Sequence, residues 1–128
     1  MPEPLLASLS IGAGAFVGAN LRYGIGLLWG RLFTHPFPGD TLVINVAGSF
    51  LLAFVAGLIE RQVQVSHYVR LLLTVGFCGG FTTFSTFALE TMGMLRAGSG
   101  GWAALYMLAS VGLSVLAAFA GFWLAGRA

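Results

Sequence analysis

Charge is scarce in this sequence: only 8% of its 128 residues are charged, and none of the charged residues is a lysine. Soluble domains carry about 25% charged residues, so this chain cannot cover a globule with a solvated surface. Its net charge of +2 is too small to indicate nucleic-acid binding. The single cysteine, Cys78, excludes an intrachain disulfide and fits neither a metal cluster nor a redox pair. These scarcities predict an integral membrane protein.

Hydrophobic residues make up 58% of the chain, and the mean hydropathy is +0.92. No lysine or arginine precedes Arg22, so the N-terminus lacks the charged region of a secretory signal peptide and is expected to stay in the mature protein. A helix needs about 20 apolar residues to cross a bilayer. The charge-poor stretches predict four such spans, at about residues 5–30, 41–59, 69–95 and 102–125. One all-α transmembrane domain over residues 1–128 follows.

The arginines show no preference for either side of the membrane. The termini and the second connector share one side, which holds Arg61, Arg70 and Arg127. The opposite side holds Arg31 and Arg96, and also Arg22 if that side chain snorkels there. A membrane protein without this bias can insert both ways, and opposite copies can pair as an antiparallel, dual-topology homodimer. Four helices enclose too little space for a pore, and the 19 glycines favour close helix association.

The third span carries GFCGGFTTFSTF at residues 76–87, which places weak helix formers in its middle. Glycine and β-branched threonine are poor helix formers, so Gly79-Gly80 and Thr82-Thr83 predict a break near the midplane. In lipid, a break is tolerated only where the freed backbone groups meet protein, water or an ion. The alternative is ordinary close packing by the glycines, with the threonines bonded back to the preceding turn.

This run, together with GANLRYG at 18–24 and NVAGSF at 45–50, resembles the Fluc-type (CrcB-like) bacterial fluoride channels. The resemblance covers the whole chain, and GGFTTFSTF is its most specific part. It implies a fluoride-selective channel in the bacterial inner membrane, which lets toxic cytoplasmic fluoride leave passively down its electrochemical gradient. It also implies an antiparallel homodimer with two fluoride pathways. A structural Na⁺ would lie on the dimer axis, held by the backbone carbonyls of Gly79 and Thr82.

The resemblance also implies roles along the pathway by motif position. Phe84 and Phe87 become its aromatic lining, and Asn45 becomes an amide donor facing them. Arg22 becomes the cation of a vestibule, and Glu90 falls near a pathway mouth. Taken alone, Asn45 fits a hydrogen bond between helices equally well, the phenylalanines fit plain packing, and Arg22 fits snorkelling to the interface.

The residue types suit a small, strongly hydrated anion, because a dry path must replace the hydrogen-bond donors of water. Ser85 and Thr86 supply hydroxyl groups. Aromatic rings present a positive edge, which attracts an anion weakly enough for the anion to leave again. In the fourth span, hydroxyl groups recur every four residues at Tyr106, Ser110 and Ser114, which places them on one helix face. Ordinary helix contact explains this stripe too, and the resemblance favours a polar track along a pore.

Three other functions are less consistent with the sequence. A small drug/proton antiporter needs a carboxylate deep in the membrane, whereas all four acidic residues lie at span ends: Glu3, Asp40, Glu60 and Glu90. A non-transporting assembly subunit leaves Asn45 and the hydroxyl stripe unexplained. An enzyme is least favoured, because no nucleophile and base stand at catalytic spacing.

Overall fold

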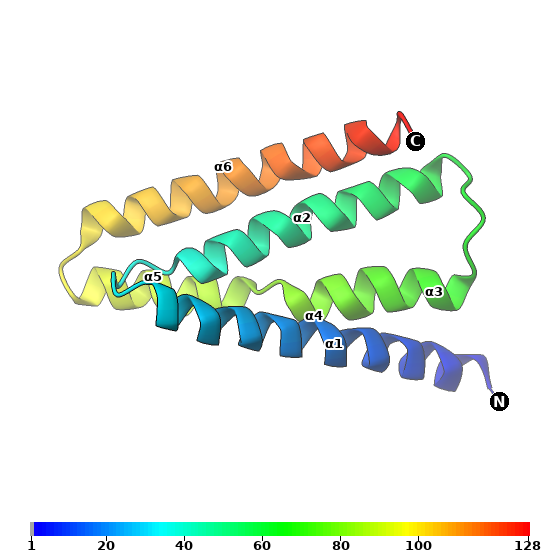
Figure 1. Ribbon diagram of the computed structural model, residues 1–128, viewed down its shortest axis with the longest axis horizontal. Coiled ribbons are helices and arrows are strands. Elements are labelled where there is room, and N and C mark those ends of the chain that lie inside the picture. The colour runs from blue at the N-terminus through cyan, green and yellow to red at the C-terminus, as the bar shows by residue number, and fades with distance from the viewer. Residues whose placement is uncertain (1) are drawn as a thin grey trace.

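A computed structural model describes residues 2–128, which form helices joined by short connectors (Figure 1). Three helices are continuous: α1 (Glu3–Leu32), α2 (Gly39–Glu60) and α6 (Gly100–Ala125). The third stretch consists of four consecutive segments: α3 (His67–Leu71), the π-helix η1 (Leu72–Cys78), α4 (Gly79–Phe81) and α5 (Phe84–Arg96). Four helical stretches, including the whole of 67–96, are long and apolar enough to cross a membrane. The all-α class and the number of spans are therefore confirmed.

The helices run up and down, so that each of the four long stretches is antiparallel to the next (Figure 1). Both termini and the connector between α2 and α3 lie at one end of the molecule, as the sequence predicted. The connectors α1–α2 and α5–α6 lie at the other end. Pro36 and Pro38 stand in the first of these connectors, where proline cannot donate the backbone hydrogen bond that a continued helix would need.

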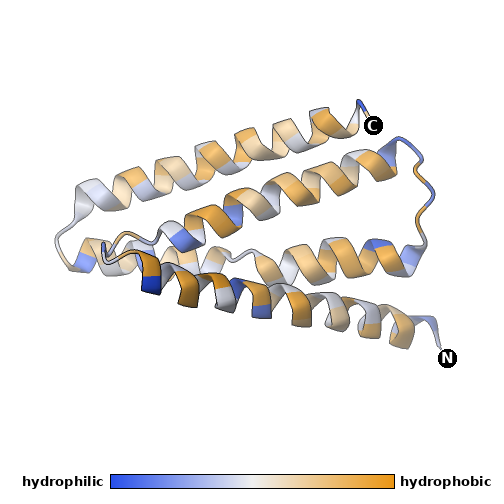
Figure 2. Cartoon of the chain, in the orientation of Figure 1, coloured by the Kyte–Doolittle hydropathy of each residue, from blue (hydrophilic) through white to orange (hydrophobic). Residues whose placement is uncertain are grey.

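Apolar residues make up most of the helical stretches, and the hydrophilic residues concentrate toward helix ends and connectors (Figure 2). Phe16, Leu108 and Phe119 are each more than 70% exposed. Such exposure is unfavourable in water and normal against lipid or another transmembrane chain. The exposed surface of the chain therefore agrees with its predicted membrane location.

The bundle consists of two closely packed helix pairs. In one pair α2 packs along α6, and in the other α1 packs along η1 and α4. The second pair depends on glycine, because its backbones touch: a Cβ at Gly18 would collide with the carbonyl oxygen of Phe77. A Cβ at Gly80 would lie 2.7 Å from the carbonyl oxygen of Ala15. Small residues allow this approach in membranes, where van der Waals contact replaces the hydrophobic effect between helices.

Two residues with extended backbone separate α4 from α5. Thr82 has φ −82° and ψ 158°, and Thr83 has φ −150° and ψ 119°. Thr83 then caps the new helix, since its Oγ1 accepts a hydrogen bond of 3.1 Å from the N–H of Thr86. The peptide groups around these two residues are thereby freed from helical hydrogen bonding, and they form the centre of the site described below.

We expect Gly18→Ala to lower the free energy of unfolding by about 1–3 kcal/mol, because its methyl group would force α1 away from η1. Gly12→Ala is the matched control on the same helix, since a Cβ there would meet nothing within 4 Å. Thermal unfolding in detergent would measure both variants. Equal stability of Gly18→Ala, Gly12→Ala and the unchanged protein would contradict the tight contact.

Candidate functional site

A groove of about 370 Å³ runs along α2, the Thr82-Thr83 segment, α5 and α6. Besides Thr82 and Thr83, its polar and aromatic lining comes from the following residues: Asn45, Ser49, Phe84, Phe87, Ser110 and Ser114. Five of these six side chains were predicted from the sequence to line an anion pathway. The fold thus brings motifs from the second, third and fourth spans into one groove.

Asn45 fixes the extended segment to α2 by two hydrogen bonds. Its Nδ2 donates to the carbonyl oxygen of Thr83 at 2.9 Å, and its Oδ1 accepts from the N–H of Thr83 at 2.8 Å. The N–H and the carbonyl of Thr83, which a continuous helix would have paired, are therefore both satisfied by one side chain. An amide NH₂ group has two hydrogens, so one N–H remains beside the groove. The residue combines an interhelical bond with a spare donor.

Phe84 and Phe87 lie together at the start of α5, with ring centroids 5.6 Å apart and planes inclined by 44°. Phe84 is 80% exposed, so its ring projects away from its own subunit. Phe87 instead packs against Tyr106 of α6, with centroids 5.1 Å apart. One ring is thus anchored inside the chain, and the other stands at the open side of the groove.

The serines of the groove differ from most other helical hydroxyls of this chain. Ser8, Thr74 and Thr91 each donate back to a carbonyl four residues earlier. Ser110 is only 7% exposed, and its Oγ has no hydrogen-bond partner among residues 2–128. Burying a hydroxyl without a partner costs about 1–3 kcal/mol. Ser110, in the wall of the groove, is therefore suited to bind a ligand or water there.

Ser49 is a groove residue that the sequence analysis missed. It lies on α2, one helical turn after Asn45, and lines the wall that faces Ser110 and Ser114. The signal was present in NVAGSF, since residues four apart share a helix face. Asn45 and Ser49 thus form a polar pair on α2 that complements the stripe on α6.

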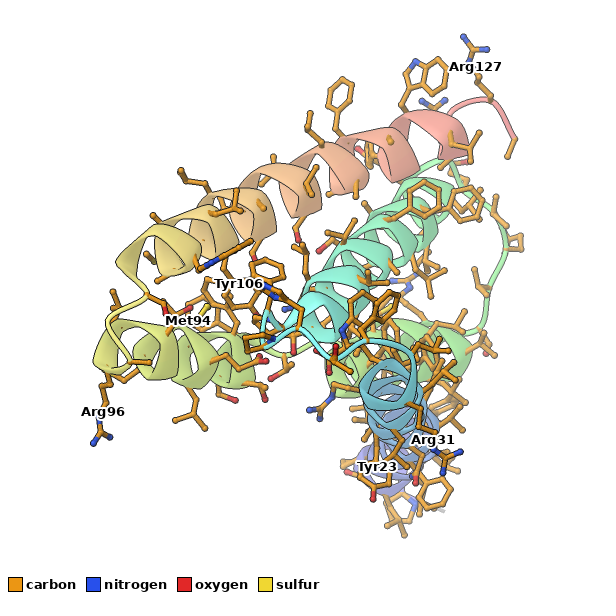
Figure 3. The ribbon with its side chains drawn as sticks, turned by 60° about the vertical axis from the view of Figure 1, so that its left-hand side comes forward. Tyr23, Arg31, Met94, Arg96, Tyr106 and Arg127 are labelled. Atoms are coloured by element: carbon orange, nitrogen blue, oxygen red, sulfur yellow. The ribbon has the colours of Figure 1, made fainter. Side chains whose placement is uncertain are left out.

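Tyr106, Ser85 and Thr86 lie outside this groove. Tyr106 is fully buried, extends from α6 toward α5 (Figure 3), and donates its hydroxyl to Oε1 of Glu90 at 3.2 Å. Glu90 lines a separate cavity of about 410 Å³ at the end of the bundle that carries the α1–α2 and α5–α6 connectors. Ser85 is exposed. The roles predicted for these residues remain predictions.

Arg22 extends from α1 toward the extended segment. Its Nε donates to the carbonyl oxygen of Gly80 at 3.2 Å. It lines a cavity of about 510 Å³ together with Asp40 and Thr86. The guanidinium of Arg22 is thereby fixed beside the Thr82-Thr83 segment, and Asp40 offsets part of its positive charge in this cavity. The vestibule role predicted for Arg22 remains a prediction.

The freed carbonyls around Thr82 and Thr83 fall into two groups. Those of Gly80 and Thr83 accept hydrogen bonds from Arg22 and Asn45. The N–H of Thr83, the helical partner of the Gly79 carbonyl, donates to Asn45 instead. The N–H of Thr86 likewise donates to the side chain of Thr83 rather than to the Thr82 carbonyl. Within residues 2–128, no hydrogen bond reaches the carbonyls of Gly79 and Thr82.

Known proteins resemble this chain over almost its whole length. The family described as CrcB-like protein, Camphor Resistance (CrcB), matches residues 9–122. A protein of Chlorobium phaeobacteroides named fluoride-specific ion channel FluC is 44% identical, over 98% of this chain and 97% of its own. Fluoride-specific ion channel FluC 1 of Nitrobacter hamburgensis is 44% identical over 88% of this chain and 90% of its own. Fluoride-specific ion channel FluC of a Roseiflexus species is 41% identical over 88% of this chain and 91% of its own.

We expect Asn45→Ala to lower the free energy of unfolding by about 1–3 kcal/mol, because it leaves the N–H and carbonyl of Thr83 without partners. Asn20→Ala is the matched control. That amide is exposed and donates only to the carbonyl of Phe16 in its own helix. Thermal unfolding in detergent distinguishes the two. If Asn20→Ala lost as much stability as Asn45→Ala, the two hydrogen bonds between Asn45 and Thr83 would not be stabilising the fold.

Proposed function

This chain belongs to the CrcB-like protein family, and from that membership we propose that it is a fluoride-selective ion channel. It is a multi-pass protein of the bacterial inner membrane, and a transporter rather than an enzyme. The observation that carries the proposal is the groove, whose lining combines the unpartnered hydroxyl of Ser110 with aromatic rings. The chain that forms this groove is related along almost its full length to proteins named as fluoride-specific channels. Its role is to let toxic cytoplasmic fluoride leave passively down its electrochemical gradient.

Hydroxyl donors replace the water that fluoride must shed. Ser110 and Ser114 on one wall and Ser49 on the other surround the ion with O–H groups, and the spare N–H of Asn45 adds a further donor. The positive edges of Phe84 and Phe87 attract the anion without a formal charge. Because none of these neutral groups binds fluoride as strongly as a positively charged side chain would, fluoride is released as readily as it enters.

Charged residues act beside this path. The Arg22 side chain raises the local anion concentration in the cavity beside the extended segment. Glu90 acts near a pathway mouth, at the end of the bundle that carries the α1–α2 connector, and its carboxylate holds the Tyr106 hydroxyl there. Ser85 and Thr86, at the start of α5, supply hydroxyls between the groove and the vestibule.

The groove is incomplete in one subunit, which supports an antiparallel homodimer with two pathways. Phe84 is 80% exposed beside a groove that is open on one side. A second copy would cover the ring and close the groove. The balanced arginine count of the two membrane faces supports dual topology, because it gives neither orientation an advantage. The extended segment then functions as a helix break near the midplane of the bilayer.

A structural Na⁺ on the dimer axis fits the donors that are present. The carbonyls of Gly79 and Thr82 lack partners among residues 2–128, and Gly79 is exposed. Two copies would supply four neutral, hard oxygen atoms, which suit a hard monovalent cation and leave a divalent ion poorly compensated. The bound charge would stabilise the dimer and attract anions to the nearby groove.

A proton-coupled antiporter is the less favoured alternative. Such a transporter needs a carboxylate on its substrate path, whereas the described lining of the groove includes no acidic residue. A non-transporting subunit would have no use for the buried, unpartnered Ser110 hydroxyl, which costs stability.

Liposomes that contain only this protein test the function directly. Fluoride-loaded vesicles should release fluoride when an ionophore collapses the membrane voltage, and chloride-loaded vesicles should keep their chloride, because the small hydroxyl and amide donors of the groove suit the smaller fluoride ion better than the larger chloride ion. An ion-selective electrode measures the release. Equal chloride release, or a strict need for a proton gradient, would reject the proposal. In the same assay Ser110→Ala should slow fluoride release by roughly tenfold, through the loss of a hydrogen bond to an ion, whereas Ser8→Ala should not change it.

Sodium dependence tests the proposed cation. Replacing Na⁺ by choline during purification should lower the thermal stability of the dimer, because the neutral carbonyls then face one another without a cation. Thr82→Ser should keep the sodium response, since the ligand is a backbone atom, and Thr74→Ser controls for the loss of a threonine methyl elsewhere in the same stretch. The same stability in both salts would remove the sodium site.

A further inference from the structure

A cavity of about 310 Å³ lies where α2 and α6 end, at the end of the molecule that carries both termini (Figure 1). It is lined by the following residues: Arg61, Phe119, Phe122, Trp123, Gly126 and Arg127. The described lining thus includes two arginines, three aromatic rings and no acidic residue. The cavity is far along α6 from the groove residue Ser110 and takes no part in the proposed pathway.

Both guanidinium groups are held near the C-terminus of α6. Arg127 lies over the ring of Trp123, with its Cζ 4.0 Å from the ring centroid. Arg61 reaches across from the end of α2, where a Cβ at Gly126 would lie 2.5 Å from its Nη2. Stacking on a ring engages the face of a guanidinium and leaves its N–H donors free. The two arginines therefore present donors to the same cavity.

An exposed apolar stripe on α6 runs up to these arginines. Leu116, Phe119 and Trp123 are 65%, 74% and 53% exposed, at helical positions i, i+3 and i+7. Arg127 continues the same face one turn later, and its side chain extends away from the bundle (Figure 3). The aliphatic and aromatic groups thus lie along α6, and the arginines lie at its C-terminal end, near the membrane surface. A phospholipid has the same order, with an acyl chain in the membrane interior and a charged headgroup at the surface.

We propose that this cavity and stripe bind an acidic phospholipid. The phosphate of the headgroup accepts hydrogen bonds from Arg61 and Arg127, and one acyl chain lies along Leu116, Phe119 and Trp123. Charge complementarity favours this occupant over a second copy of the chain. An antiparallel copy would bring Asp40 and Glu90 to this end, and both are half-buried within their own chain, so the two arginines would be covered without a free carboxylate. It is favoured over free phosphate because free phosphate would leave the adjoining apolar stripe unused. The site is independent of fluoride conduction and adds a lipid partner to the proposed function.

Native mass spectrometry of protein taken from bilayers with equal phosphatidylglycerol and phosphatidylcholine tests this site. The unchanged protein should retain phosphatidylglycerol preferentially. Arg61→Gln with Arg127→Gln should lower the retained phosphatidylglycerol by roughly tenfold, the order expected for two arginines at a membrane surface. Arg31→Gln with Arg96→Gln is the matched control, because it removes the same charge from the other end of the chain.

Equal retention of the two lipids, or equal loss in the two double variants, would overturn the lipid site. Displacement of the lipid by millimolar inorganic phosphate would also overturn it, since the acyl chain would then contribute nothing. A photocrosslinker placed at residue 119 that joins two copies of the chain would assign the stripe to a protein contact instead. Because retention is read without any ion gradient, these results do not depend on whether the protein conducts fluoride.

Discussion

A bilayer interior contains no water to form hydrogen bonds with non-helical backbone. Every N–H and carbonyl group that Thr82 and Thr83 free from helical bonding therefore needs a partner within the protein or an ion. Asn45 supplies two of these partners, and Arg22 supplies a third. The two hydrogen bonds of Asn45 also join the helix pair of α2 and α6 to the pair of α1 and the third stretch. The groove lies beside this junction and depends on it.

The same constraint relates the glycines to the site. Gly18 and Gly80 let α1 touch the third stretch closely enough for the Arg22 side chain to reach the carbonyl of Gly80. If the two backbones stood further apart, the carbonyl would lack its donor and the guanidinium would be free to move toward the interface. Helix packing and the placement of the Arg22 guanidinium are therefore one feature of the structure.

Stability is also given up at the groove. Ser110 keeps a buried hydroxyl without a partner among residues 2–128, although it could donate to a carbonyl of its own helix, as Ser8 and Thr91 do. An unsatisfied polar group in a low-dielectric interior is costly, and it persists where a ligand satisfies it.

The sequence by itself determined the membrane class, the four spans, the up-and-down order and, through GGFTTFSTF, the family. These depend on hydrophobic length and local motif, which a linear pattern records. Only the tertiary structure decided what each polar group contacts: that Asn45 bonds to Thr83, that Tyr106 is buried against Glu90 outside the groove, and that Ser49 joins its wall. Hydrogen-bond partners come from different helices, and their distances depend on how closely those helices approach. That approach is set by glycine contacts across the bundle, which spacing along one helix does not encode.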